Sequence, residues 1–171
     1  LSLAYQELGQ WQQAEAAISS SLKLIQSNRN SNNLVSRKLI FAQALNTQGS
    51  LQLAQGKTEQ ALHTWQKAAG AYTEAGSISG KIGASLNQAQ AQQALGMYLQ
   101  ARKTLKELEQ TLLNQPDQEL KITGLRSLGN VLRLVGDLND SHRVLKQITK
   151  IQNINTTFKQ HLSLTFLNLG N

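Results

Sequence analysis

Residues 42–69 read AQALNTQGSLQLAQGKTEQALHTWQKAA, and this stretch decides the fold. Small and apolar residues recur on both sides of a turn at Gly56, at the steps of three and four that mark one face of an α-helix. They are Leu45, Gly49 and Leu51 before the turn, and Ala61, Leu62, Trp65 and Ala68 after it. The stretch therefore predicts two amphipathic helices packed as an antiparallel hairpin.

The turn of this hairpin recurs along the chain. Gly9, Gly96 and Gly136 are each followed two residues later by an apolar or aromatic residue, and five residues later by a small one. With Gly56 included, the four glycines are separated by 47, 40 and 40 residues. A fixed period in this range is the signature of a helical repeat array. The longer first step contains an Asn- and Ser-rich run at residues 27–33, which we interpret as a loop.

The period divides the chain into one repeat domain of five units and about nine helices. The units are residues 1–33 (partial), 34–77, 78–116, 117–155 and 156–171 (partial). In the third unit we place the first helix at 81–95, with Gly76 and Gly80 flanking the turn before it. Both ends of the chain fall inside helix patterns, so we expect a fragment of a longer protein.

Composition favours helices and excludes several classes of protein. The chain has one proline and no cysteine, so neither a disulfide framework nor a thiolate metal site is expected. The net charge is +7, but no run of Lys and Arg exceeds two residues, which favours solvated helix faces over a nucleic-acid site. No apolar run approaches the roughly 20 residues of a membrane span. The sequence leaves the compartment open between the cytoplasm, which we favour, and export, because it lacks a native N-terminus.

Catalytic chemistry has no support in the sequence. His63, His142 and His161 fall on three different predicted helices, so they do not form one metal or substrate site. Gly76, Gly80 and Gly83 are not followed by the Lys-Ser or Lys-Thr pair of a phosphate-binding loop. We therefore expect no enzyme, no cofactor and no metal.

Two sets of side chains carry further structural predictions. Gln48 and Gln52 recur forty residues later as Gln88 and Gln92. Because a buried amide without partners is costly, we predict that these glutamines bond across neighbouring first helices or reach solvent. The aromatic residues of the second helices are expected to pack between helices, and they are Trp11, Trp65 and Tyr98.

The pattern resembles tetratricopeptide repeats (TPRs), in which the first helix carries an apolar residue and a Leu-Gly pair, and the second carries spaced Ala, aromatic and Ala. In the second unit these places hold Leu45, Gln48-Gly49, Ala61, Trp65 and Ala68; in the fourth they hold Leu125, Leu128-Gly129, Ser141, Leu145 and Ile148. The step of 40 exceeds the usual 34 of the family and points to its long-repeat branch. Residues 84–98 are also similar to bacterial arrays that precede a caspase-like CHAT domain. The resemblance implies an all-α solenoid of stacked antiparallel hairpins in a right-handed superhelix.

The resemblance also implies a concave groove lined by the first helices. Its predicted partner-binding residues are amides, one serine and two arginines, and they are Gln43, Asn46, Ser50, Asn87, Gln90, Gln93, Arg126, Asn130 and Arg133. Thr47 belongs to the same face. The set of Lys, Asn and Arg side chains with which some family members bind acidic C-termini is matched only by Asn87, so we do not expect that activity.

These patterns predict a non-catalytic scaffold that binds a peptide, a helix or a domain of its own parent chain in the groove. The alternative is a self-association or spacer segment with an empty groove, in which the terminal helices stack end to end on other copies. Neither hypothesis calls for nucleic acid or a membrane as a partner.

Overall fold

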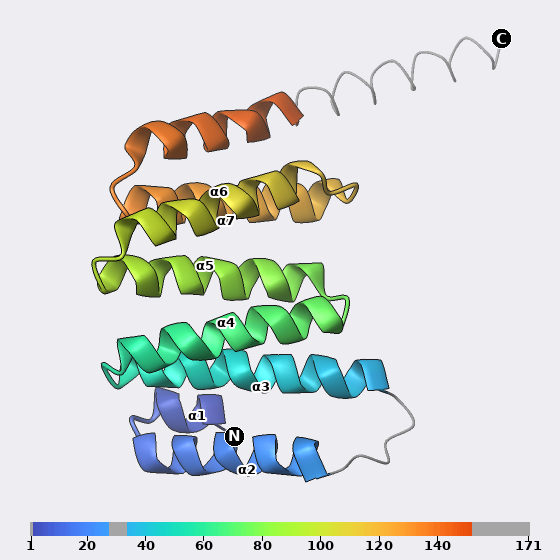
Figure 1. Cartoon of the computed structure of the whole chain (residues 1–171), viewed down its shortest axis with the longest axis vertical. Coiled ribbons are helices and arrows are strands. Elements are labelled where there is room, and N and C mark those ends of the chain that lie inside the picture. The colour runs from blue at the N-terminus through green and yellow to red at the C-terminus, as the bar shows by residue number, and fades with distance from the viewer. Residues whose placement is uncertain (1, 28–33, 152–171) are drawn as a thin grey trace, which may run out of the picture. The chain divides into compact units, whose positions relative to one another are not determined.

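The computed structural model describes residues 2–27 and 34–151. Within these ranges every regular element is an α-helix and no strand is formed (Figure 1). The prediction of an all-α chain of helix hairpins is therefore confirmed, while the ninth predicted helix lies outside the described residues. The helices are α1 (Ser2–Glu7), α2 (Trp11–Ser27), α3 (Leu34–Ala54), α4 (Thr58–Glu74), α5 (Ile78–Ala94), α6 (Tyr98–Leu113), α7 (Gln118–Leu134) and a helix at 138–151.

Four glycines close the turns inside the hairpins. Gly9, Gly56, Gly96 and Gly136 have φ values of 68°, 75°, 75° and 85°, in the left-handed region that only glycine occupies without a steric cost. After α3, the N–H of Lys57 donates to the carbonyl of Gln52 at 2.8 Å, which satisfies one of the carbonyls that a helix end leaves unpaired. The predicted positions of these turns are confirmed.

The start of α5 differs from the prediction. The helix begins at Ile78 rather than at residue 81, because the Ser77 hydroxyl caps it by accepting a hydrogen bond from the N–H of Gly80 at 3.3 Å. Gly80 therefore lies in the first turn of the helix and does not flank the preceding loop. Its lack of a side chain is explained by packing, since a Cβ there would lie 2.2 Å from the Tyr72 ring.

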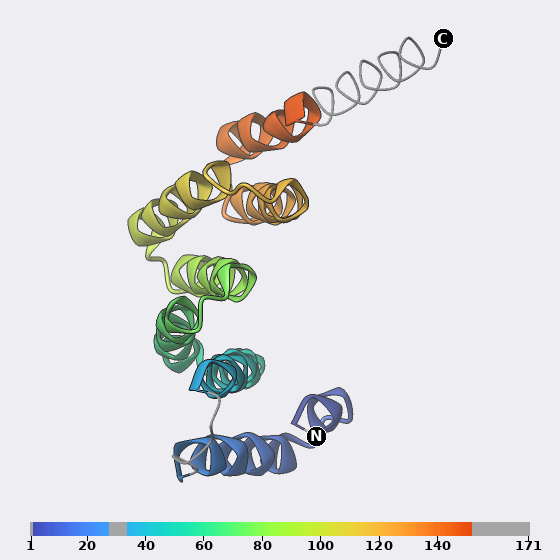
Figure 2. The ribbon, with the colours of Figure 1, turned by 90° about the vertical axis from the view of Figure 1, so that its right-hand side faces the viewer.

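The chain forms two compact units, unit 1 at Leu1–Leu108 and unit 2 at Glu109–Asn171, with the boundary inside α6. Unit 1 buries its apolar residues between neighbouring helices, and Figure 2 shows its helices following one another through the unit. One cluster, which includes Ala14 and Leu51, joins α2 to α3. Others join α3, α4 and α5 around Leu45 and Tyr72, and α4 and α5 around Trp65. Burial between neighbours is how a repeat array is stabilised.

Unit 2 repeats this packing between α7 and the helix at 138–151. The Ser141 hydroxyl donates to the Gly129 carbonyl at 2.7 Å, where the two helices cross closely. A Cβ at Gly129 would lie 2.6 Å from the Leu145 side chain, so only glycine fits beneath that leucine. Gly129, Ser141 and Leu145, which carried the TPR resemblance in the fourth repeat, therefore lie in contact.

Candidate functional site

Two of the predicted groove residues meet across neighbouring first helices of unit 1. The Nδ2 of Asn87 on α5 donates to the Oδ1 of Asn46 on α3 at 3.3 Å. Both side chains are half-buried, so the pair keeps contact with solvent. This bond sets the amides of successive repeats side by side.

The other predicted residues of unit 1 surround this pair. Gln43 is exposed, and Ser50, Gln90 and Gln93 are half-buried. The Ser50 hydroxyl donates to the Asn46 carbonyl at 3.2 Å, so its proton is used within the helix. We call this surface the amide face, and its residues are Gln43, Asn46, Ser50, Asn87, Gln90 and Gln93.

The remaining predicted residues lie in unit 2. Arg126, Asn130 and Arg133 are all exposed on α7, at the spacing of one helix face. Arg133 lies in the last turn of α7, where a cation is favoured by the partial negative charge of the helix C-terminus. The predicted set thus falls into two groups on separate units, and the amide face contains only the first group.

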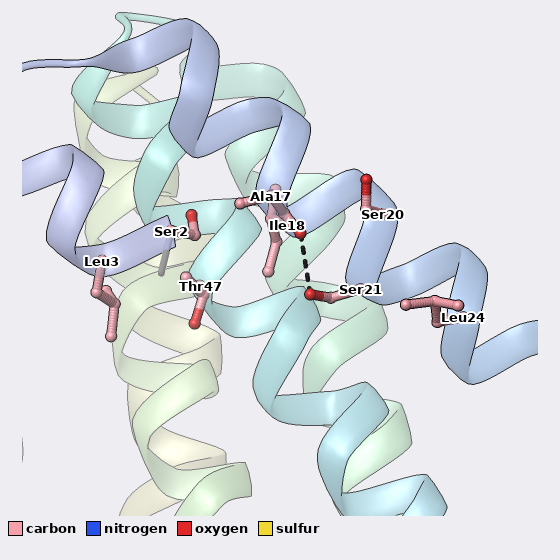
Figure 3. A pocket seen from close by; sticks show the side chains of 8 residues that line it. All are labelled: Ser2, Leu3, Ala17, Ile18, Ser20, Ser21, Leu24 and Thr47. Atoms are coloured by element: carbon pink, nitrogen blue, oxygen red, sulfur yellow. Dashed lines mark hydrogen bonds between the residues drawn. The ribbon is translucent and has the colours of Figure 1, made fainter.

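An open cavity of about 500 Å³ lies beside the amide face, between α1, α2 and α3 (Figure 3). Two of its hydroxyls donate within their own helices: Ser21 donates to the Ala17 carbonyl at 2.9 Å, and Thr47 donates to the Gln43 carbonyl at 3.1 Å. Leu3 and Leu24 are exposed, so the cavity offers mainly apolar surface. Of its residues, only Thr47 was part of the predicted face. The lining is Ser2, Leu3, Ala17, Ile18, Ser20, Ser21, Leu24 and Thr47.

The repeated glutamines have different partners from those predicted. The Thr64 hydroxyl on α4 donates to Oε1 of Gln52 at 2.7 Å, and the Thr104 hydroxyl on α6 donates to Oε1 of Gln92 at 3.0 Å. The prediction that each amide bonds across neighbouring first helices or reaches solvent is therefore wrong for Gln92, which is buried and bonded to a second helix. Gln52 is half-buried and keeps contact with solvent, but its bond is likewise to a second helix. Both glutamines point toward the second helix of their own hairpin, where a threonine lies twelve residues further along the chain.

The predicted packing of the aromatic residues holds for only one of them. Trp65 is 2% exposed beneath its neighbours in unit 1. Trp11 and Tyr98, at the starts of α2 and α6, are 41% and 63% exposed, so the prediction is wrong for both. Their position two residues after a turn glycine places them at the edge of the hairpin, beyond the reach of the paired helix.

A charged cluster that the sequence did not reveal lies in unit 2. Glu109 is buried, and its carboxylate accepts hydrogen bonds from Arg143 and, at 3.1 Å, from the amide of Gln147. The Arg143 hydrogen bond lowers the pKa of Glu109 and, together with Asp140, raises the pKa of Arg143. Because the guanidinium donates to both carboxylate oxygens, the cluster fixes the helix at 138–151 against the end of α6.

The described residues contain no group of three or more His, Cys, Asp and Glu side chains that would hold a metal ion. His63 and His142 are exposed on separate helices, and His161 lies outside the described residues. In the described part of the chain, every helix is too short or too polar to cross a bilayer.

Comparison with known proteins supports the fold. No protein-family model matches the chain, and no curated protein matches it. The structure is similar to a crystal structure of the nearly identical TPR-like repeats of a kinesin light chain candidate from Podospora anserina, with a TM-score of 0.50 and 14% identity. The match covers 92% of this chain and 93% of that chain. Since an identity this low shows the fold alone, the conclusion is that the chain has a TPR-like helical-repeat fold.

Proposed function

We propose that this chain is a non-catalytic scaffold that binds another protein on the amide face of unit 1. The observation that carries the proposal is the hydrogen bond from Asn87 to Asn46. Asn46 uses its side-chain oxygen in this bond and keeps its NH₂ group, whereas Asn87 uses its NH₂ group and keeps its oxygen. The pair therefore still offers N–H donors on Asn46 and an amide oxygen on Asn87, and the main chain of a bound peptide requires both kinds of group.

The other polar residues extend this chemistry. Gln43, Gln90 and Gln93 add neutral donors and acceptors around the pair, so we expect binding to depend only weakly on salt. In unit 2, Arg126 and Arg133 are exposed and suit carboxylate groups, which an arginine binds through two parallel hydrogen bonds.

One class of partner is a domain of the parent chain. The similarity of residues 84–98 to bacterial arrays that precede a CHAT domain supports this possibility, and the scaffold would then position the neighbouring domain. In that case the isolated 171-residue chain should bind the separately expressed domain.

The test compares proteins captured from a lysate of the source organism by three immobilised chains. We expect the Asn46→Ala/Asn87→Ala variant to lose most of the proteins that the wild type enriches. The control variant, Gln60→Ala/Gln66→Ala, changes two exposed amides of α4 and should retain them. Equal capture by all three chains would contradict the proposal.

A self-association or spacer role is the second candidate. Tyr98 and Leu99 at the start of α6 are 63% and 83% exposed, and the turns α1–α2, α3–α4 and α5–α6 lie along one side of unit 1 (Figure 1). Light scattering over a range of concentrations tests it. A mass that rises with concentration in the wild type, but not in the Tyr98→Ser/Leu99→Ser variant, would support self-association, and a constant monomer mass would exclude it.

A further inference from the structure

We propose that the hairpin of α3 and α4 carries a second binding site, a small apolar pocket edged by lysines that takes one apolar side chain flanked by carboxylates on a partner protein. The pocket is a cavity of about 250 Å³ within unit 1. Its lining residues are Lys38, Phe41, Leu45, Lys67, Gly70, Ala71 and Glu74. None of them belongs to the amide face.

The pocket and the amide face lie on different sides of α3. Successive residues of an α-helix are rotated by about 100° around its axis. Gln43 on the amide face is two residues from both Phe41 and Leu45 in the pocket, a rotation of about 200°. The pocket therefore opens away from Gln43, and its occupant would not compete with a peptide bound near Asn46 and Asn87.

The floor of the pocket is an unfilled part of the apolar core. Leu45 belongs to the buried cluster with Ala42, Ala68, Tyr72 and Ala84, and Phe41 and Ala71 pack against that cluster while staying partly exposed. An apolar side chain that enters the cavity would cover Phe41 and Ala71 and remove them from water. A cavity of about 250 Å³ is smaller than most cofactor sites, which supports a single side chain as the occupant.

Gly70 shapes the wall of the pocket. It lies inside α4, where glycine is less favourable than alanine because it has more backbone freedom to lose. A Cβ at Gly49 or Gly80 would collide with a neighbouring ring, but a Cβ at Gly70 would meet nothing within 4 Å. Packing within the described structure therefore does not require this glycine. It leaves the α4 backbone bare along the pocket wall, where a partner side chain can approach closely.

The rim of the pocket favours a negatively charged partner. The half-buried Lys38 pairs with the exposed Glu74 at 3.2 Å. Lys67 is exposed and has no ion-pair partner among the described residues. The rim thus carries one unpaired cation, Lys67, beside the Lys38–Glu74 ion pair, so its net charge is positive. A carboxylate on one side of the bound apolar side chain would meet Lys67, and one on the other side would share Lys38 with Glu74. Because these charges are exposed, the attraction should weaken as salt is added.

The experiment titrates the 15N-labelled chain with three synthetic peptides, each acetylated and amidated. The probe has one leucine between two pairs of aspartates; one control replaces the leucine by alanine, and the other replaces the aspartates by lysines. We expect the probe to shift the amide signals of Gly70 and Ala71 and to bind roughly tenfold more tightly than either control. No shift at these residues, or equal binding of the three peptides, would overturn the proposal.

Variants assign the site. Gly70→Leu fills the cavity and Lys67→Glu reverses the charge of the rim, so each should weaken probe binding by roughly tenfold. Gly83→Leu is the matched control, because Gly83 is also a helical glycine with open space around its Cβ position but does not line the pocket. Circular dichroism establishes that each variant is folded, and undiminished binding by folded Gly70→Leu and Lys67→Glu would overturn the proposal. Asn46→Ala/Asn87→Ala should bind the probe normally, which separates this site from the amide face.

Discussion

Gly49 on α3 lies directly against the indole of Trp65 on α4, where an added Cβ would come within 2.7 Å of the indole Nε1. The tryptophan is 2% exposed and cannot withdraw into solvent without uncovering the core. Gly49→Ala should therefore destabilise the chain, although alanine is the better helix former by roughly 1 kcal/mol. Since overpacking a core costs roughly 1–3 kcal/mol, we expect a net loss of about 1 kcal/mol in the free energy of unfolding.

Urea unfolding followed by circular dichroism measures this loss. The matched control is Gly83→Ala on α5, where the added Cβ meets nothing within 4 Å and stability should rise by roughly 0.5–1 kcal/mol. A Gly49→Ala chain that unfolds at the same urea concentration as the wild type, or at a higher one, would show that the indole moves freely.

This contact also shows why the hairpins were predictable from sequence. The spacing of Gly49, Trp65 and the turn glycine Gly56 is set by the geometry of two crossing helices. The sequence shows that geometry as small and apolar residues at steps of three and four. The sequence places the start of α5 three residues too late, because Gly80 resembles a turn glycine. Its real role is to make room for the Tyr72 ring on the preceding helix. A glycine that signals a turn and one that makes room for a ring look identical in a sequence.

The candidate site was predicted only in part, for a related reason. Helix spacing placed Asn46 and Asn87 on exposed faces of successive first helices, and their contact follows from the repeat itself. The pairing of Glu109 with Arg143 spans 34 residues and depends on burial that no local pattern encodes. The pocket beside Gly70 is formed by side chains of α3 and α4 together, so the pattern of neither helix alone predicts it.

Ser77 should contribute measurably to the stability of unit 1 as the N-cap of α5. Its hydroxyl accepts from the N–H of Gly80, one of the amides that a helix start leaves unpaired. Ser77→Ala should lower the free energy of unfolding by about 1 kcal/mol, while Ser77→Asp should retain it. Urea unfolding measures both, and equal stability of the alanine and aspartate variants would mean that the cap is dispensable.

The hydrogen bond between Thr104 and Gln92 should behave as a coupled pair. Gln92 is buried, so Thr104→Val should leave its amide oxygen without a donor and cost roughly 1–3 kcal/mol. The equivalent positions of unit 2, four residues before and eight after the turn glycine, are the buried apolar residues Leu132 and Val144. Combining Thr104→Val with Gln92→Leu reproduces that pair and should recover most of the loss.

A double-mutant cycle in urea quantifies this coupling. If the double variant is as unstable as the sum of its two single variants, the residues do not act as a pair, and the polar bond has no apolar substitute in unit 1.

The buried Glu109 in unit 2 should make stability depend on pH in acid. The Arg143 hydrogen bond lowers the pKa of Glu109 below its ordinary value of 4.5. A carboxyl group whose pKa is lowered by folding stabilises the folded state above the unfolded pKa, and this contribution is lost as pH falls through the folded pKa. Glu109→Gln removes the charge that Arg143 pairs with, so at pH 7 it should cost roughly 1–2 kcal/mol, because Arg143 itself is half-exposed.

The measurement is the urea midpoint of the wild type and of Glu109→Gln between roughly pH 2 and 7, a range that extends well below the ordinary pKa of a glutamate. The gap between the two proteins should be widest at neutral pH and should close as the carboxylate of the wild type is protonated. Glu107→Gln on α6 is the control for an exposed ion pair, since Glu107 pairs with Lys103 at 3.9 Å, and it should change stability far less than Glu109→Gln does. A gap that stays constant down to the lowest pH would mean that the glutamine variant loses packing rather than the ion pair, since only the ion pair responds to the titration of Glu109.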